Sequence, residues 1–358
     1  MAANTNAPVD TCTSGEPGLD TVILPAGVYE LTLQGDENLG ASGDLDVLDD
    51  LEIQGSGRDV TTITTNLSEF LISWSSYEAD FPQTPPDLLI SGVRLENPGD
   101  FSLIYYRQFP FSGQEVSVSA SNSFDFVVEN SFLESGGVEL AGVDAHFNNT
   151  ILSSANVTND YFAFYSELWY FPGAVNITLD TSVLLYGSTL SANNAFFYDS
   201  LFTNWSDNGG GIGAVGARGI VMFRSTVDGV IADAAFFGNP VSMTIFDSTF
   251  TGCSVASFAD ISGSSLQLYR VTAVDNDVDV LFSADSAVAR VEDSIIAGNT
   301  FTDTAACDWS QAIQLTATNN VFSPANGCDS SPQATQVEGN TFLDESEIAL
   351  NPIGYYGG

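Results

Sequence analysis

A short phrase of sequence recurs along this chain at nearly constant intervals. Each copy has alternating apolar residues, then Asn, Asp or Arg, then Ser or a substitute, then more apolar residues and a turn, as in "SMTIFDSTFTGCS" at 242–254. Aligned on the Ser, the positions 225, 248, 271 and 294 follow one another at 23 residues. A period of roughly 20–25 residues is typical of leucine-rich repeats or of a parallel β-helix. The aligned positions are Ser131, Thr150, Ser182, Ser200, Ser225, Ser248, Val271, Ser294, Asn320 and Asn340.

The residues inside each copy favour strands. Val, Ile, Phe and Thr alternate with polar residues, and Gly, Asn, Asp and Ser break the runs, whereas the Leu-x-x-Leu-x-Leu skeleton of leucine-rich repeats is missing. The sequence therefore predicts an all-β fold, a right-handed single-stranded parallel β-helix (a solenoid) of about 12–13 coils stacked about 4.8 Å apart. We expect an N-terminal cap and first coil over 1–40, the β-helix over 41–330 and a C-terminal coil or tail over 331–358, all in one continuous solenoid domain.

The polar residues of the repeat are predicted to be architectural. In "TIFDSTF", Ile245 is expected to point inward, and Asp247 and Ser248 to mark a corner. Asp and Asn tolerate the left-handed backbone that such corners need, and a Ser side chain can hydrogen-bond to the turn backbone.

Charge limits the partners of the chain. It has 46 acidic residues, seven Arg and no Lys, for a net charge of −39. Such a surface repels nucleic acid, anionic membranes and polyanionic substrates, and it suits a salty or cation-rich medium. No apolar stretch is long enough to span a membrane, so we expect neither nucleic-acid binding nor membrane insertion. The first residues, "MAANTNAPVD", have no signal-peptide pattern, and we expect an export signal outside this chain.

Several segments resemble one bacterial family. These are "AANTNAPVDTC", "LDTVILPAGVYELTL" and "GDLDVLDDLEIQGSGRDVTTI" within the first 65 residues, "SIIAGN" in the repeats and "ALNPIGYYGG" at the end. They resemble the secreted CSLREA-domain proteins, although the Cys-Ser-Leu-Arg-Glu-Ala motif of that name is absent. The resemblance implies a right-handed β-helix of the pectate-lyase-like type and an extracellular or cell-surface location, and it implies little chemistry.

Catalytic motifs of β-helix enzymes are largely missing. Pectin-cleaving lyases need a carboxylate cluster with Ca²⁺ and a Lys or Arg base, and polygalacturonase-like hydrolases need a Gly-His-Gly and an Arg-x-Lys. This chain has no Lys, its one histidine (His146) lacks flanking glycines, and Arg224 and Arg270 occupy equivalent corner positions two coils apart. The sequence favours a protein without catalytic residues. It leaves open a hydrolase of neutral glycans, which needs only two carboxylates.

One acidic cluster is a weak candidate for a metal site. Asp275, Asp277 and Asp279 alternate in "VDNDVDV", but Val280 and Ser286 stand where an EF-hand needs Gly and Glu. Alternation places all three carboxylates outward on one strand. We expect a solvated acidic face with no cofactor, where Ca²⁺ would bind weakly at most.

The cysteines point to an oxidising compartment. Cys307 and Cys328 are 21 residues apart, which is about one coil, so we predict a disulfide between adjacent coils. Cys253 is expected to be a buried core thiol.

Aromatic segments interrupt the repeat in three places, at "SWSSYEADFPQTPPD", "YYRQFPFSG" and "NDYFAFYSELWYFPGA". They either cover the solenoid or form a surface that stacks on sugar rings or packs against another copy of the chain. The sequence thus favours an extracellular structural or adhesive cell-surface module that self-assembles or binds a surface glycan. The alternative is a polysaccharide-active enzyme (glycoside hydrolase or lyase) or a glycan-binding module. The candidate binding residues are Trp74, Tyr77, Tyr105, Tyr106, Tyr161, Phe162, Tyr165, Trp169 and Tyr170.

Overall fold

The computed structural model contains strands and no helix in the part of the chain that it describes. Its residues form two compact units, Met1–Thr178 with Ser188–Ala192, and Leu179–Gly187 with Asn193–Gly358. Strands β14 (Asn176–Asp180) and β16 (Thr189–Tyr198) contribute residues to both units. The structure describes residues 13–15, 18–34, 44–65, 71–75, 87–97, 104–107, 125–140, 144–159, 176–180, 182–185, 189–203, 215–238, 240–301, 307–309, 311–323, 328 and 334–342.

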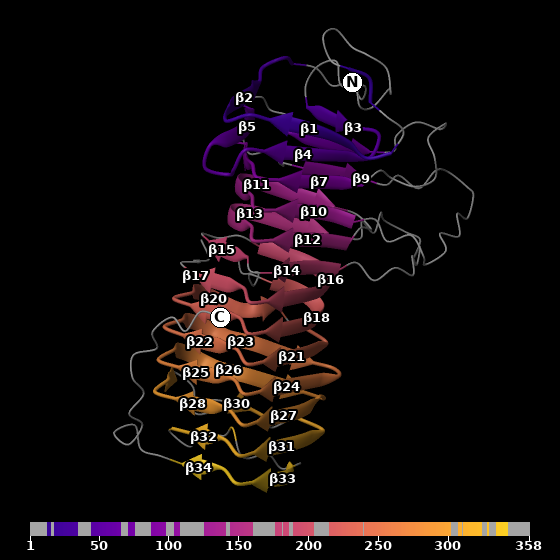
Figure 1. Cartoon of the computed structure of the whole chain (residues 1–358). Coiled ribbons are helices and arrows are strands. Elements are labelled where there is room, and N and C mark those ends of the chain that lie inside the picture. Colours follow the sequence, from indigo (N-terminus) through magenta and orange to yellow (C-terminus); the bar gives the residue numbers. More distant parts are fainter. Residues whose placement is uncertain are drawn as a thin grey trace, which may run out of the picture. The chain divides into compact units, whose positions relative to one another are not determined.

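In the first unit, parallel strands stack into three columns (Figure 1). The first column is β1 (Asp20–Leu24), β4 (Leu51–Gly55), β7 (Leu88–Ser91), β10 (Asp125–Glu129) and β12 (Asp144–Asn148). The second is β2 (Gly27–Leu31), β5 (Thr61–Thr65), β8 (Arg94–Glu96), β11 (Phe132–Leu140) and β13 (Ile151–Asn159). The third is β3 (Leu45–Val47), β6 (Ile72–Ser75) and β9 (Ile104–Arg107).

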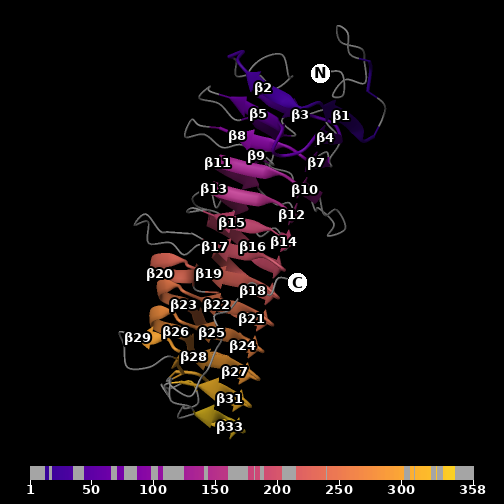
Figure 2. The same cartoon turned by 60° about the vertical axis from the view of Figure 1, so that its left-hand side comes forward.

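The second unit repeats this arrangement (Figure 2). Its first column is β18 (Val215–Phe223), β21 (Ser242–Phe246), β24 (Ser265–Tyr269), β27 (Val288–Glu292), β31 (Gln314–Thr318) and β33 (Ala334–Glu338). The second is β15 (Val183–Leu185), β17 (Leu201–Thr203), β19 (Thr226–Asp228), β22 (Thr249–Thr251), β25 (Thr272–Val274), β28 (Ile295–Ala297), β32 (Val321–Phe322) and β34 (Thr341–Phe342). The third is β20 (Ile231–Gly238), β23 (Ser254–Ser262), β26 (Asp277–Asp285), β29 (Thr300–Phe301) and β30 (Cys307–Asp308).

Register explains why the chain repeats itself. Ser242, Ser265 and Val288 are parallel partners on successive strands, as are Thr226, Thr249 and Thr272. Each coil therefore places equivalent residues beside those of the next coil. This is a parallel β-solenoid, and the predicted all-β fold class is confirmed.

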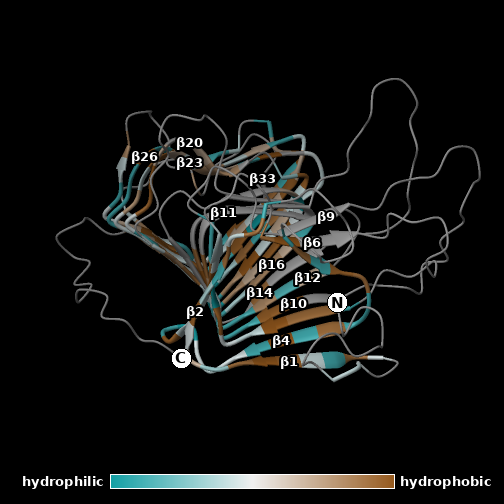
Figure 3. Ribbon diagram, turned by 90° about the horizontal axis from the view of Figure 1, so that it is seen from above, coloured by the Kyte–Doolittle hydropathy of each residue, from teal (hydrophilic) through white to brown (hydrophobic). Residues whose placement is uncertain are grey.

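Alternation along each strand builds the core. Met243 and Ile245 of β21 and Leu266 and Leu268 of β24 are fully buried, while the residues between them face outward. Figure 3 shows hydrophobic and hydrophilic residues on the same strands. In the second unit, phenylalanine rings also pack with centroids 4.6–6.5 Å apart. Each buried ring contributes roughly 1.5–3 kcal/mol. The rings belong to Phe202, Phe236, Phe237, Phe250, Phe258 and Phe282.

The predicted disulfide between Cys307 and Cys328 is confirmed, with the two Cα atoms 4.7 Å apart. The indole N–H of Trp309 donates to the carbonyl of Cys328 at 3.2 Å, and all three residues are buried. Closing a loop of 21 residues stabilises the fold by about 3 kcal/mol in the chain-entropy description. Cys253 is a free, buried thiol, as predicted, and burial raises its pKa to about 11.

None of the described segments is a helix long and apolar enough to cross a lipid bilayer.

Candidate functional site

The recurring polar pair forms the first corner of each coil, between the first and second strand columns. Its leading residue has a left-handed backbone, and the following Ser points inward and is buried. Because left-handed backbone disfavours most side chains, Asn and Asp dominate this position. The architectural interpretation of the motif is confirmed. The leading residues are Asn130, Asn149, Asp199, Arg224, Asp247, Arg270, Asp293 and Asn319, with φ from 47° to 58°.

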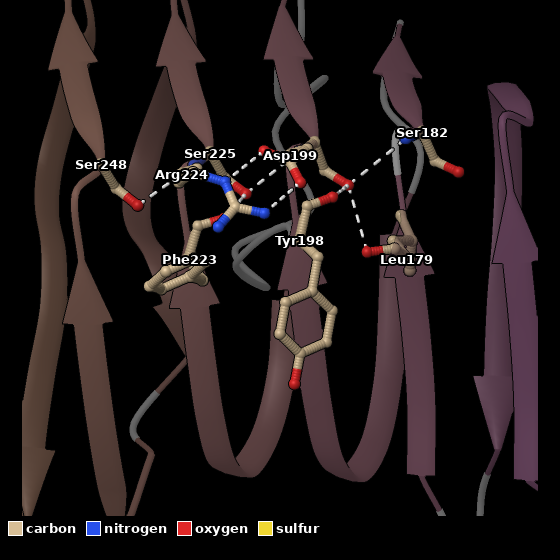
Figure 4. Close-up of polar contacts among 9 residues, drawn as sticks. Leu179, Ser182, Tyr198, Asp199, Phe223, Arg224, Ser225 and Ser248 are labelled. Atoms are coloured by element: carbon tan, nitrogen blue, oxygen red, sulfur yellow. Dashed lines mark hydrogen bonds and ion pairs between the residues drawn. The ribbon is translucent and has the colours of Figure 1, made fainter. Parts of the chain in front are cut away.

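The inward residues link successive coils by hydrogen bonds. In the second unit, the backbone N–H of Ser200 donates to Ser225 Oγ at 3.1 Å, and that of Ser225 donates to Ser248 Oγ at 3.2 Å (Figure 4). Further along, Ser294 donates in the same way to Asn320 Oδ1 and Asn320 to Asn340 Oδ1. Each link satisfies a buried backbone donor. The Ser of the motif therefore serves the fold.

Arg224 and Arg270 at the first corner each form an ion pair with an aspartate of the neighbouring coil. Arg224 donates through Nε and Nη2 to the two carboxylate oxygens of Asp199, at 2.7 and 2.6 Å (Figure 4). Arg270 donates to both carboxylate oxygens of Asp247 in the same way. The hydrogen bond from each guanidinium lowers the pKa of its Asp, and the nearby positive charge adds to this effect. The equivalence of Arg224 and Arg270 predicted from the repeat is confirmed. These pairs stiffen the corner and leave both acids ionised.

Beside this corner lies a surface with almost no charge. We call the outward residues of β18, β21, β24, β27 and β31 the neutral face. Its charged residues are Arg218 of β18, which is exposed, and the pair of Arg290 and Glu292, whose Nε and Oε1 are 2.7 Å apart. The neutral face consists of Arg218, Gly219, Val221, Phe223, Ser242, Thr244, Phe246, Ser265, Gln267, Tyr269, Val288, Arg290, Glu292, Gln314, Thr316 and Thr318.

An aromatic column runs along one side of the neutral face. The rings of Phe246 and Tyr269 are stacked, with centroids 4.9 Å apart, and Phe223 meets Phe246 edge-on at 6.2 Å. The guanidinium of Arg224 covers the Phe223 ring at 4.3 Å, and that of Arg290 lies 5.4 Å from the Tyr269 ring. The ring faces are therefore in contact with the protein itself. The column offers a ligand a half-exposed apolar strip of ring edges.

Hydroxyl and amide groups occupy the rest of the neutral face. Ser242 and Ser265 are in register, as are Thr244, Gln267 and Arg290. The Tyr269 hydroxyl donates to Gln267 Oε1 at 3.2 Å, which ties the polar row to the aromatic column. The result is a row of neutral donors and acceptors on β21, β24 and β31, with Arg290 of β27 between them.

The outward side of β23 and β26 differs sharply in the same coils. We call it the acidic face: Asp277, Asp279 and Asp285 are exposed, and Asp260 accepts a hydrogen bond from Ser283 Oγ at 2.7 Å. Asp277 and Asp279 are exposed on β26, as predicted, but Asp275 lies in the turn between β25 and β26 with φ of 56°, so the prediction that all three share one strand is wrong. Among the described residues, no group of three or more His, Cys, Asp or Glu side chains is arranged to hold a metal ion. Weak Ca²⁺ binding here remains a prediction.

Asp199 and Asp247 do not fit the role of a general acid. A general acid needs a raised pKa. The pKa values of Asp199 and Asp247 are both lowered. His146 is half-buried on the outward side of β12, in register with Val127.

The structure corrects the placement of three predicted aromatic residues. Trp74 lies on β6, and Tyr105 and Tyr106 lie on β9, with Trp74 and Tyr106 as parallel partners. They belong to the third strand column and not to loops between coils, because β-propensity and alternation continue through them. Tyr77, Tyr161, Phe162, Tyr165, Trp169 and Tyr170 lie outside the described residues, so their binding role stays a prediction.

The neutral face was missed in the sequence. Its signal is the outward half of strands such as β21 and β24, S-x-T-x-F and S-x-Q-x-Y, which lacks acids in a chain rich in them. To recognise this signal, the outward-facing residues of each strand must be considered separately from the inward-facing ones.

No known protein family and no curated protein matches this sequence. Among solved structures, the A-module of the mannuronan C-5 epimerase AlgE6 of Azotobacter vinelandii is 14% identical, over 91% of this chain and 87% of that one, with a TM-score of 0.37. The catalytic unit of a GH87 α-1,3-glucanase from Streptomyces thermodiastaticus is 12% identical, over 93% of this chain and 65% of its own, with a TM-score of 0.39. Both neighbours are polysaccharide-active enzymes with a β-helix. The likeness is one of fold, and the site is argued from this chain's own residues.

Proposed function

We propose that this protein is an adhesive, polysaccharide-binding β-helix of the cell exterior that holds a neutral glycan along its neutral face. The observation that carries the proposal is the charge of that face. In a chain of net charge −39, the described outward residues of five successive strands include one acid, Glu292, which is paired with Arg290, and one further charge, that of Arg218. A surface without unpaired acids suits contact with an uncharged partner, because burying unpaired carboxylates is costly.

The geometry of the face matches a linear polymer. Neighbouring strands lie about 4.8 Å apart, which is close to the length of one sugar in an extended chain. The in-register Thr244, Gln267 and Arg290 would meet equivalent hydroxyls on successive sugars. The edge strip of Phe223, Phe246 and Tyr269 would pack against the apolar C–H groups beside them. Acidic glycans are disfavoured by the field of the whole chain.

Two further features support a place outside the cell. The Cys307–Cys328 disulfide is typical of oxidising compartments. Segments within the first 65 residues resemble secreted CSLREA-domain proteins, and this resemblance also leads us to expect a location outside the cell.

The test is binding to a panel of insoluble and soluble neutral polysaccharides, with polygalacturonate as the acidic control. We expect the native chain to bind at least one neutral glycan and no polygalacturonate. Thr244→Glu with Gln267→Glu, which charges the neutral face, should weaken binding at least tenfold. Ser254→Glu adds a carboxylate at an exposed outward position of β23 and is the matched control, expected to bind normally.

Two outcomes would contradict the proposal: no neutral glycan binds the native chain, or the two variants bind equally well. Release of soluble sugars by the native chain would instead support the polysaccharide-active enzyme considered from the sequence.

A further inference from the structure

A further strand beside the neutral face also lacks outward acids. Strand β16 pairs with β18, and its residues after position 192 belong to the second unit. Its described outward residues are Asn194, Phe196 and Tyr198, all half-buried. The corner residues that follow the two strands, Asp199 and Arg224, occupy equivalent positions and are joined by two hydrogen bonds. Counting back from this corner therefore shows which outward residues of β16 and β18 are neighbours.

The surface beside Phe196 is low. By this register, Phe196 lies beside Val221, and the outward residue before Val221 on β18 is Gly219. A Cβ atom placed on Gly219 would lie 2.5 Å from Oδ1 of Asn194, so no side chain fits there. Glycine inside a strand often marks a place where a ligand approaches the backbone closely. The backbone at Gly219 therefore forms a floor next to the Phe196 ring.

The rings of Phe196 and Tyr198 differ in their contacts from the aromatic column. Rings of that column are covered by one another or by a guanidinium, as at Phe223, whose ring lies 4.3 Å from the guanidinium of Arg224. Tyr198 lies beside Phe223 on the neighbouring strand (Figure 4), yet no ring or guanidinium contacts Tyr198 or Phe196 in the part of the chain that the structure describes. The face of an aromatic ring carries partial negative charge, which attracts the slightly positive C–H groups of a sugar. These two rings are therefore suited to stacking.

Arg218 provides hydrogen-bond donors at the edge of this surface. It precedes Gly219 on β18 and is exposed, and among the described residues its side chain has no ion pair or hydrogen bond. In a chain with 46 acidic residues, an arginine without a carboxylate partner keeps its N–H donors for a ligand. By contrast, a carboxylate is held by Arg94, Arg224, Arg270 and Arg290.

We propose that Phe196 and Tyr198 form a stacking subsite for one sugar ring of the glycan, with the backbone at Gly219 as its floor and Arg218 as a donor to its hydroxyl oxygens. This inference rests on the proposed function and names the part of the site that contributes most to affinity. The ligand class is an uncharged pyranose that presents C–H groups on one face of its ring. Ring faces offer a sugar more contact area than ring edges, so this subsite binds more tightly than the aromatic column. The rest of the polymer continues over β21 and β24.

The test measures binding of the native chain and its variants to the same panel of neutral polysaccharides. Phe196→Leu with Tyr198→Leu keeps apolar side chains but removes both ring faces, and it should weaken binding roughly tenfold or more. Tyr198→Phe keeps the ring and should bind within about twofold of the native chain. Phe132→Leu is the matched control, because Phe132 is another half-buried outward ring, on β11, and this variant should bind normally.

Two further comparisons separate stacking from other contributions. Phe223→Leu with Phe246→Leu changes rings whose faces are already covered, so it should weaken binding less than the Phe196 and Tyr198 double variant does. Arg218→Gln should weaken binding about threefold through the lost donors. Arg58→Gln removes the same charge from the first unit, where Arg58 donates to the Asn149 carbonyl, and should bind normally.

Unfolding midpoints that match the native chain show that each variant folds. The subsite is wrong if the Phe196 and Tyr198 double variant binds as tightly as the native chain, or no more weakly than the double variant of the aromatic column. If charging the neutral face still weakens binding in that case, the proposed function stands and only the subsite is overturned. If the native chain binds no neutral glycan, both proposals are wrong.

Discussion

The two corners of each coil in the second unit solve the same problem with different residues. At the first corner the left-handed position holds Asp199, Arg224, Asp247, Arg270, Asp293 and Asn319, with Gly339 in the last described coil, whereas at the second corner, between the second and third strand columns, it holds Gly229, Gly252, Asp275 and Gly298. The residue that follows is Ser, Val or Asn at the first corner and Val, Cys or Asn at the second. A side chain is retained at most of the first corners although glycine would suit the backbone better.

The difference shows what each corner contributes. At the first corner, the strained residues project charge outward, and Asp–Arg pairs span neighbouring coils beside the neutral face. At the second corner, buried amides do the linking. Asn276 donates to the Phe250 carbonyl at 3.1 Å and accepts from the Cys253 N–H at 3.0 Å, and Asn299 continues the ladder. Both corners link coils on their inner side, and the Asp–Arg pairs lie on the outer side of the first corner.

The largest expected effect is at the second corner. Asn276→Ala leaves the buried N–H of Cys253 and the carbonyl of Phe250 without this partner, at about 1–3 kcal/mol for each group. Ser248→Ala at the first corner removes the acceptor of the Ser225 N–H and a donor to the Phe246 carbonyl, which still accepts from the Arg224 N–H. We expect the free energy of unfolding to fall by about 3 kcal/mol for Asn276→Ala and about 1–2 kcal/mol for Ser248→Ala. Urea titration followed by circular dichroism measures both, and equal losses would remove the distinction between the corners.

A swap of the left-handed residues gives a smaller effect. Gly298 has φ of 66°, and an added Cβ would lie 2.9 Å from Asp275 Oδ1. Gly298→Ala should therefore cost about 1–2 kcal/mol, from the left-handed backbone and this contact. The reverse swap at the first corner, Asp293→Gly, relieves backbone strain and should change stability by about 0.5 kcal/mol or less. Thermal melts of the two variants test this pair; a Gly298→Ala chain as stable as the native one would contradict it.

The smallest effect concerns the outer charge pairs. Asp199→Asn removes an ion pair whose partners are 32% and 53% exposed, so it should cost only about 0.2–1 kcal/mol, and less in high salt. The sign of its pH dependence follows from the lowered pKa of Asp199. The pair stabilises the fold fully above the ordinary value of 3.8, and this stabilisation is lost as the pH falls through the lowered pKa. The native chain and the variant should therefore converge in stability in acid. A gap that widens below pH 3 would show that another group is responsible.

Much of the architecture could be predicted from the sequence. The 23-residue spacing and the strand alternation were sufficient for a parallel β-solenoid, because a coil that cannot bury its own apolar side must stack on a similar coil. The corner role of Asp247 and Ser248 followed from the backbone chemistry of those residue types. The Cys307–Cys328 disulfide followed from a separation of one coil.

Other features were decided by the tertiary structure. The sequence treated "SWSSYEADF" and "YYRQFPFSG" as interruptions, but neighbouring strands recruit Trp74, Tyr105 and Tyr106 into the third column. The neutral face exists only once the coils align Thr244, Gln267 and Arg290 in one row, since each strand by itself shows just two or three uncharged outward residues. Local chemistry determines how a coil turns, whereas the register between coils, which no single segment encodes, determines which surfaces the protein presents.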